Sequence, residues 1–72
     1  MANMTHVNQY IKVNFPELDI KAVRGDGYVY FDGDDGFDKV ESLMVSSTSV
    51  DTDTLVDMVI EQIQDACLGE DV

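Results

Sequence analysis

Carboxylates dominate the side chains of this sequence that could do chemistry. The 72 residues include fifteen aspartates and glutamates, against four lysines and arginines, one histidine and one cysteine. His6 lies near the start, and Cys67 lies on the apolar side of a helical pattern, where cysteine usually acts as a small core residue. A structural zinc site needs about four such ligands. We therefore expect no enzyme active site, no metal and no cofactor.

The densest group of acids is the loop from residue 32 to residue 38. Its acidic residues are Asp32, Asp34, Asp35 and Asp38. A calcium-binding EF-hand needs oxygen ligands at its first, third and fifth positions, glycine at the sixth and glutamate at the twelfth. Placing Gly36 at the sixth position puts Phe31 at the first and Ser42 at the twelfth. We interpret the loop as a turn within an acidic surface, and its four aspartates as candidate partner-binding residues.

A second group of acids recurs every four residues near the end of the chain. It consists of Asp53, Asp57, Glu61 and Asp65. On a helix these residues form one stripe, with about 6 Å between successive positions along the axis. Apolar residues repeat at the same interval, two positions later: Leu55, Val59, Ile63 and Cys67. Two residues of offset correspond to a rotation of about 200°, so the acidic stripe is expected to lie opposite the core side of the helix.

The chain carries a net charge of −11, and no lysine or arginine follows residue 39. Like charges four residues apart destabilise a helix by about 0.2–0.5 kcal/mol per pair, and no basic residue offsets them here. Carboxylates about 6 Å apart resemble the phosphates of one nucleic-acid strand, which a groove lined with lysine and arginine neutralises. The stripe therefore suggests a nucleic-acid mimic. The alternative is a solvated face in a salt-adapted protein.

The positions of apolar residues predict the elements that carry these acids. Spacing by four predicts a helix over residues 5–15, with Thr5 as its N-cap and Pro16 after its end. Alternation predicts strands over residues 18–23 and 41–46, and a run of aromatic and β-branched residues predicts the return strand over 28–31. A second amphipathic helix is expected to start between residues 51 and 53 and to end before Gly69.

We therefore predict an α+β fold over the single domain 1–72. A three-stranded antiparallel sheet is expected between an N-terminal and a C-terminal helix, in the order α-β-β-β-α, with both helices on one face. The expected core consists of Val7, Ile11, Phe15, Ile20, Leu43, Val45, Leu55, Val59 and Ile63. The other face of the sheet is expected to carry Lys21, Tyr28, Tyr30 and Met44.

Tyr28 and Tyr30 lie on one face of the predicted return strand. Exposed aromatic residues can stack on nucleic-acid bases, but a chain of net charge −11 repels nucleic acid. We interpret the pair as a contact patch for a protein partner, which leaves a homodimer open, or as sheet packing.

The middle of the chain resembles a group of small, mostly uncharacterised acidic bacteriophage proteins. The matching segments are Ile20–Phe31, which ends in the pattern Gly-Asp-Gly-Tyr-Val-Tyr-Phe, and Ser42–Val45. The resemblance covers about half of the chain and departs at the last helix, where the group has a tryptophan. It implies a viral origin and an accessory role in the host cytoplasm, and it supplies no active-site residues. In size and charge the chain is also similar to phage inhibitors of host nucleases, such as anti-CRISPR and anti-restriction proteins.

Together these patterns predict a phage accessory protein that inhibits a basic, nucleic-acid-binding host protein by charge mimicry. The alternatives are a phage structural or interaction module without inhibitory role, and a salt-adapted domain with no charge-specific partner. No run approaches the roughly 20 apolar residues of a membrane span, and the first residues lack a signal-peptide pattern. We expect a cytoplasmic protein that binds neither nucleic acid nor membrane directly.

Overall fold

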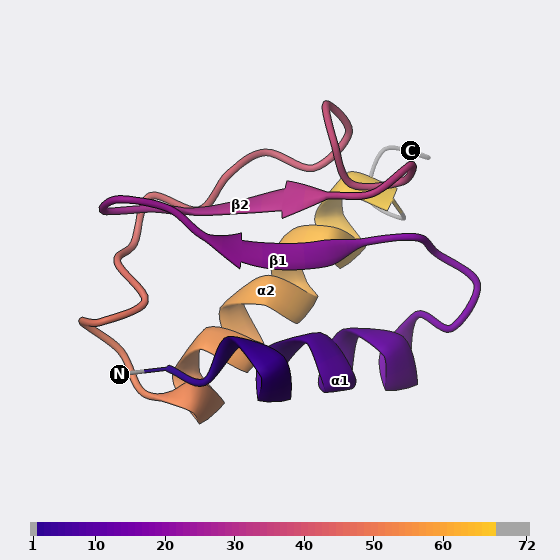
Figure 1. The fold of residues 1–72 in the computed structure, drawn as a ribbon. Helices are drawn as coiled ribbons and strands as arrows, with labels where there is room; N and C mark the ends of the chain where they lie inside the picture. The colour runs from indigo at the N-terminus through magenta and orange to yellow at the C-terminus, as the bar shows by residue number, and fades with distance from the viewer. Residues whose placement is uncertain (1, 68–72) are drawn as a thin grey trace.

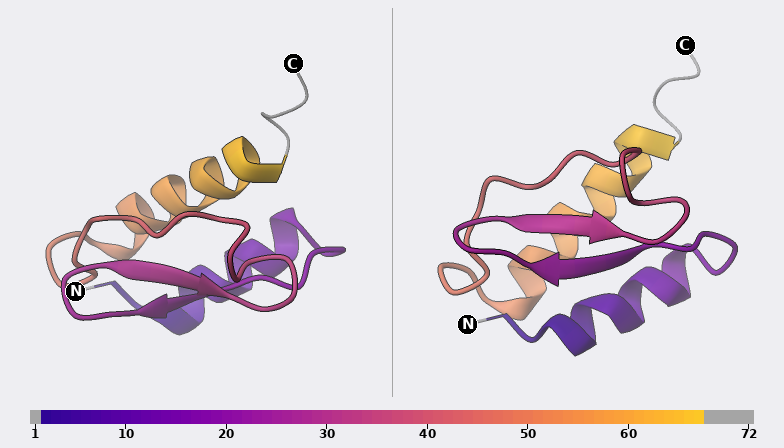
Figure 2. Two further views of the ribbon diagram at one scale, coloured as in Figure 1. Left: turned by 90° about the horizontal axis from the view of Figure 1, so that it is seen from above. Right: turned by 45° about the horizontal axis from the view of Figure 1, so that its top comes forward.

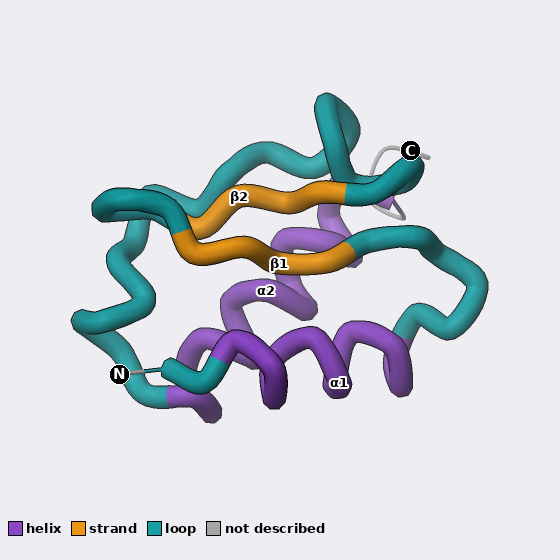
Figure 3. The backbone as a smooth tube through the Cα atoms, viewed as in Figure 1, coloured by secondary structure: helices purple, strands orange, loops and turns teal. Residues whose placement is uncertain are grey.

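The computed structural model describes residues 2–67 and contains two helices and two strands in that range (Figure 1). The elements, in chain order, are α1 (Met4–Asn14), β1 (Lys21–Arg24), β2 (Val29–Asp32) and α2 (Thr52–Cys67). Residues 33–51, which join β2 to α2, form loops and turns (Figure 3). The fold is therefore α+β, as predicted, although its sheet has two strands instead of three.

The two strands form an antiparallel hairpin; α2 crosses one face of it, and α1 runs beside β1 (Figure 2). The residues of the hairpin that face the helices are buried: Ala22, Val29 and Phe31. From α2, Leu55, Val59 and Ile63 fill the other side of the core and expose no surface. Within residues 2–67, neither helix has the length and apolarity needed to cross a membrane.

The helix α1 begins at Met4, one residue before the predicted start, and its cap lies two residues before the predicted one. Asn3 is its N-cap, because the Asn3 side chain accepts a hydrogen bond from the His6 N–H at 3.2 Å. The predicted cap, Thr5, lies inside the first turn. At the other end, the Phe15 N–H donates to the Ile11 carbonyl at 2.8 Å, and Pro16 follows. The predicted stop before proline is thus confirmed.

The side chain of Asn8 joins α1 to the outer edge of β1. Its Oδ1 accepts a hydrogen bond from the Ala22 N–H at 2.7 Å, and its Nδ2 donates to the Ala22 carbonyl at 3.0 Å. The same Nδ2 donates to the Met4 carbonyl at 2.9 Å. The amide thus occupies the place of a neighbouring strand at Ala22, and it covers the backbone groups that a sheet edge normally exposes.

The predicted third strand over residues 41–46 is wrong. This segment touches the sheet at one bridge, where Val29 and Leu43 exchange backbone hydrogen bonds of 3.0 and 2.8 Å. Its path is set by anchors at both ends. Val40 is buried in the core, and the Ser47 carbonyl accepts a hydrogen bond from the Ala2 N–H at 2.8 Å. A segment held at these two points crosses β2 beside one residue and does not run along it.

Most of the predicted core is confirmed. Val7, Ile11, Ile20, Leu55, Val59 and Ile63 are buried. Phe15, Leu43 and Val45 are only partly buried and pack around the core, because they lie at a helix end or in the crossing segment. The structure adds buried residues that the prediction lacked: Ala2, Ala22, Val29, Phe31 and Val40.

We predict that replacing Ile63 by alanine lowers the free energy of unfolding by about 2–5 kcal/mol, as for other large-to-small changes in a core. The side chain is completely buried, so the change leaves a cavity. Ile60→Ala is the matched control, because Ile60 lies on the same helix and is only partly buried. Urea unfolding of both variants measures the difference. Equal losses for the two variants would show that α2 is rotated from the position described.

We predict that Asn8→Ala lowers the free energy of unfolding by about 1–3 kcal/mol, because the Ala22 N–H and carbonyl both lose their partner. The control is Asn14→Ala in the same helix, since the Asn14 Nδ2 only donates to the exposed turn at the Tyr10 carbonyl. Thermal unfolding of both variants provides the comparison. A loss no larger for Asn8 than for Asn14 contradicts a role of Asn8 in docking the helix.

Candidate functional site

The acidic stripe of α2 lies on the solvent side of the helix, as its spacing predicted. Its members, Asp53, Asp57, Glu61 and Asp65, are all exposed. The side chains of the opposite stripe are buried, apart from Cys67, which is partly buried. Within residues 2–67, no lysine or arginine lies within ion-pair distance of these four carboxylates. The stripe is therefore an uncompensated row of negative charge on a helix that the core holds in place.

The start of α2 is fixed by a cap that determines where the stripe begins. The Asp51 Oδ1 accepts a hydrogen bond from the Thr54 N–H at 2.9 Å, and the Asp51 carbonyl accepts one from the Leu55 N–H at 3.1 Å. Hydrogen bonding from Thr54 to the carboxylate lowers the pKa of Asp51 below its ordinary value. Next to it, the Thr52 Oγ1 accepts a hydrogen bond from the Asn3 N–H at 3.0 Å. The starts of the two helices are thus joined.

A shallow hollow of about 450 Å³ adjoins the C-terminal half of the stripe. It is lined by Lys39, Glu41, Gln62, Asp65 and Ala66. The Gln62 Nε2 donates a hydrogen bond to the Glu41 carbonyl at 2.9 Å, which ties the crossing segment to α2. The exposed Glu41 therefore extends the acidic surface beyond the helix. Sequence reasoning missed Glu41, and no local pattern indicates that it lies beside a residue 24 positions later.

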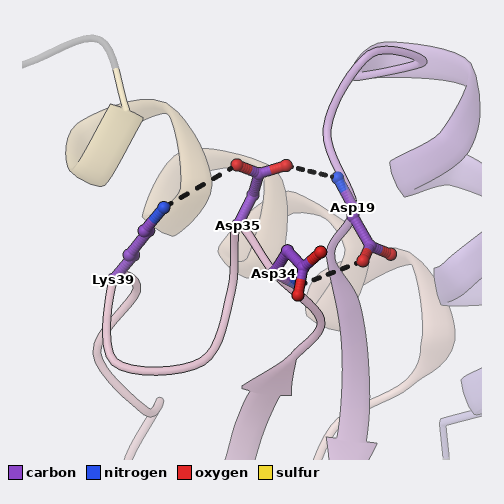
Figure 4. A network of polar contacts seen from close by, with 4 residues as sticks. All are labelled: Asp19, Asp34, Asp35 and Lys39. Carbon is purple, nitrogen blue, oxygen red and sulfur yellow. Dashed lines mark hydrogen bonds and ion pairs between the residues drawn. The ribbon is translucent and has the colours of Figure 1, made fainter.

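The carboxylates of Asp35 and Asp19 join the 32–38 loop to the segment that precedes β1 (Figure 4). The Asp35 Oδ2 accepts a hydrogen bond from the Asp19 N–H at 2.7 Å, and the Asp19 Oδ2 accepts one from the Asp34 N–H at 3.0 Å. The Asp35 Oδ1 lies 4.0 Å from the Lys39 Nζ. Lys39 also lines the hollow beside Asp65, but it forms no ion pair with the stripe.

The remaining aspartates of this loop also have local roles. The Asp32 Oδ1 accepts a hydrogen bond from the Gly33 N–H at 2.9 Å. Asp38 adopts a φ of 67°, a left-handed conformation that aspartate tolerates better than most residues. Gly33 has a φ of 98°, and a Cβ there would lie only 2.2 Å from the Asp19 carbonyl oxygen. The loop is thus a close-packed turn, and Asp34 and Asp38 are its exposed acids.

The two tyrosines lie on the face of the hairpin away from the helices. Their ring centroids are 6.0 Å apart, with an angle of 39° between the ring planes. Tyr28 is exposed and Tyr30 partly buried. The stripe of α2 faces away from the core on the other side of the molecule. The predicted site residues therefore lie in three separate places. These are the acidic face of α2, the hydrogen-bonded 32–38 loop and the aromatic face of the hairpin.

Comparison of the chain with protein-family models, curated proteins and solved structures finds no match. Among the described residues, no three histidine, cysteine, aspartate or glutamate side chains are grouped so that they could hold a metal ion. A function must therefore be argued from the charged and aromatic surfaces of this chain.

We predict that Asp51→Ala lowers the melting temperature at neutral pH, because the Thr54 N–H loses its acceptor. A carboxylate with a lowered folded-state pKa stabilises the protein above its unfolded-state pKa of about 3.9, and this effect is lost as the pH falls through the folded-state value. The difference between wild type and variant should therefore shrink below a pH of about 3.9. Thermal unfolding from pH 7 to pH 2 measures it.

Asp57→Ala is the control for this pH series. Asp57 is exposed, lies in the same helix and forms no hydrogen bond through its carboxylate among the described residues. Its removal should not lower the melting temperature at neutral pH. A deficit of the Asp51 variant that persists unchanged at pH 2 would mean that the ionised carboxylate is not what caps α2.

Proposed function

We propose that this protein binds a basic, nucleic-acid-binding protein through the acidic face of α2 and competes with nucleic acid for it. The observation that carries this proposal is the row of four exposed carboxylates, none of which forms an ion pair with a lysine or arginine within residues 2–67. A solvated helix face usually alternates charges, since pairs of opposite sign stabilise a helix and pairs of like sign destabilise it. Here the charge is retained at a cost in helix stability.

The length and charge of the stripe suit a groove that binds one nucleic-acid strand. From Asp53 to Asp65 the stripe spans about 18 Å along the axis, with one charge per 6 Å. One strand of duplex DNA carries about one charge per 3.4 Å. The stripe thus supplies roughly half the charge density of one strand, and Glu41 adds to it beside Asp65. A row of lysines and arginines would meet these carboxylates as it meets phosphates.

A long-range field also favours encounter with such a partner. A net charge of −11 attracts a basic groove and repels nucleic acid, so the effect appears mainly in the association rate. The resemblance of the hairpin to small phage proteins suggests that the partner is a bacterial nuclease or another defence protein. The protein would then act as an inhibitor in the host cytoplasm.

We predict that Asp57→Asn combined with Glu61→Gln weakens partner binding without unfolding the protein. Every pair of successive stripe acids includes one of these two residues, so the change removes all three repulsive pairs. The free energy of unfolding should stay the same or rise by up to about 1.5 kcal/mol. Partner association should slow, and the binding constant should depend less steeply on salt.

The measurement is capture from a bacterial lysate at low salt on the immobilised protein, followed by elution with duplex DNA. The matched control is Glu17→Gln combined with Asp26→Asn, which removes the same charge from exposed residues outside α2. The control variant should still capture the same basic partner as wild type, and duplex DNA should release that partner from both. Equal capture by the α2 variant would make the stripe a solvated face only. A loss of stability in that variant would make the acids structural.

A further inference from the structure

The face of the hairpin away from the helices is uncharged overall, although the chain carries a net charge of −11. Ala22, Val29 and Phe31 are buried, so their neighbours along the strands point outward. The outward residues are Lys21, Val23, Tyr28, Tyr30 and Asp32. Lys21 and Asp32 are directly paired in register, as are Val23 and Tyr30. The charges of Lys21 and Asp32 therefore cancel, and beside them lies a patch formed by Tyr28, Tyr30 and Val23.

The aromatic part of this face is preorganised. The Tyr28 ring lies over Gly25 so closely that a Cβ at Gly25 would be 2.6 Å from the ring. The Tyr30 ring lies against it at a centroid distance of 6.0 Å. Next to the hairpin, Met44 is 80% exposed although Leu43 beside it packs on the core. Rings held by backbone contacts lose little conformational entropy on binding, and tyrosine and methionine are enriched in protein interfaces.

We infer that this face binds the same face of a second copy of the chain. Among the described residues, Lys21 and Asp32 form no ion pair with each other although they are directly opposite in register. A two-fold axis parallel to the strands, between two stacked hairpins, places β1 of one copy over β2 of the other. Lys21 then lies over Asp32 of the second copy, and Val23 over its Tyr30, each contact occurring twice.

Charge favours a second copy as the occupant. A second chain of net charge −11 is repelled by the acidic α2 face. On the sheet face, by contrast, the two-fold arrangement brings Lys21 of each chain to Asp32 of the other. The resulting dimer leaves both acidic stripes on its outer sides.

The test is sedimentation equilibrium of the purified protein between about 1 µM and 1 mM, in low and high salt. We expect a concentration-dependent rise from 8.0 kDa to twice that mass. High salt should strengthen the dimer, because it screens the repulsion between two chains of net charge −11. This response is opposite in sign to that expected for partner binding by α2. A mass of 8.0 kDa at every concentration and salt level overturns the inference.

Two pairs of variants locate the interface. Lys21→Glu and Tyr30→Thr should each weaken dimerisation about tenfold or more, the loss typical of central interface residues. Lys12→Glu and Tyr10→Thr make the same changes on exposed positions of α1 and should leave it unchanged. Circular dichroism confirms that each variant is folded. The assignment to the sheet face is contradicted if neither sheet variant weakens dimerisation. It is also contradicted if the α1 variants weaken dimerisation as much as the sheet variants do.

Discussion

The junction between Asn8 and Ala22 is the contact on which the arrangement of this small fold depends. A two-stranded hairpin is marginally stable alone in water, so it must be covered by helices to persist. Asn8 supplies both a donor and an acceptor to the free edge of β1, and it does so from the helix that covers the hairpin. One amide therefore docks α1 and covers a sheet edge, from the helix whose Val7 and Ile11 are buried in the core.

The helix α2 is held by its core side against the repulsion of its solvent side. Three like-charge pairs cost about 0.6–1.5 kcal/mol in total, whereas burying one side chain such as leucine or isoleucine contributes about 1.5–3 kcal/mol. Leu55, Val59 and Ile63 are all completely buried, so their contribution exceeds the repulsion several-fold. The cap at Asp51 adds to this. The fold can thus display a dense row of charge that an isolated peptide would not hold as a helix.

The two outer surfaces of the molecule differ in the physical forces that they can use. The α2 face offers charge without apolar area, and its interactions weaken as salt screens them. The sheet face offers two tyrosines with a balanced pair of charges, and its interactions depend on buried apolar area. The 32–38 loop contributes less to either surface than its composition suggests, because Asp32 and Asp35 accept hydrogen bonds from neighbouring backbone.

The sequence by itself determined the features that depend on one element at a time. Periodicities of four and two residues located both helices and the hairpin, and they placed the stripe of α2 opposite the core. A side chain's direction relative to its own helix or strand follows from local geometry. The exposure of Asp53, Asp57, Glu61 and Asp65, and of Tyr28, could therefore be predicted from the order of residues alone.

Only the tertiary structure decided the features that depend on residues far apart in the chain. The segment around Leu43 alternates like a strand, yet its anchors at Val40 and Ser47 let it bridge β2 at a single residue. In the same way, the bonds of Asn8 to Ala22 and the position of Glu41 beside Asp65 arise when separate segments meet. Alternation and charge spacing carry no information about these tertiary contacts. The contacts are set by long-range hydrogen bonds and by the shared core, which form only when the whole chain is folded.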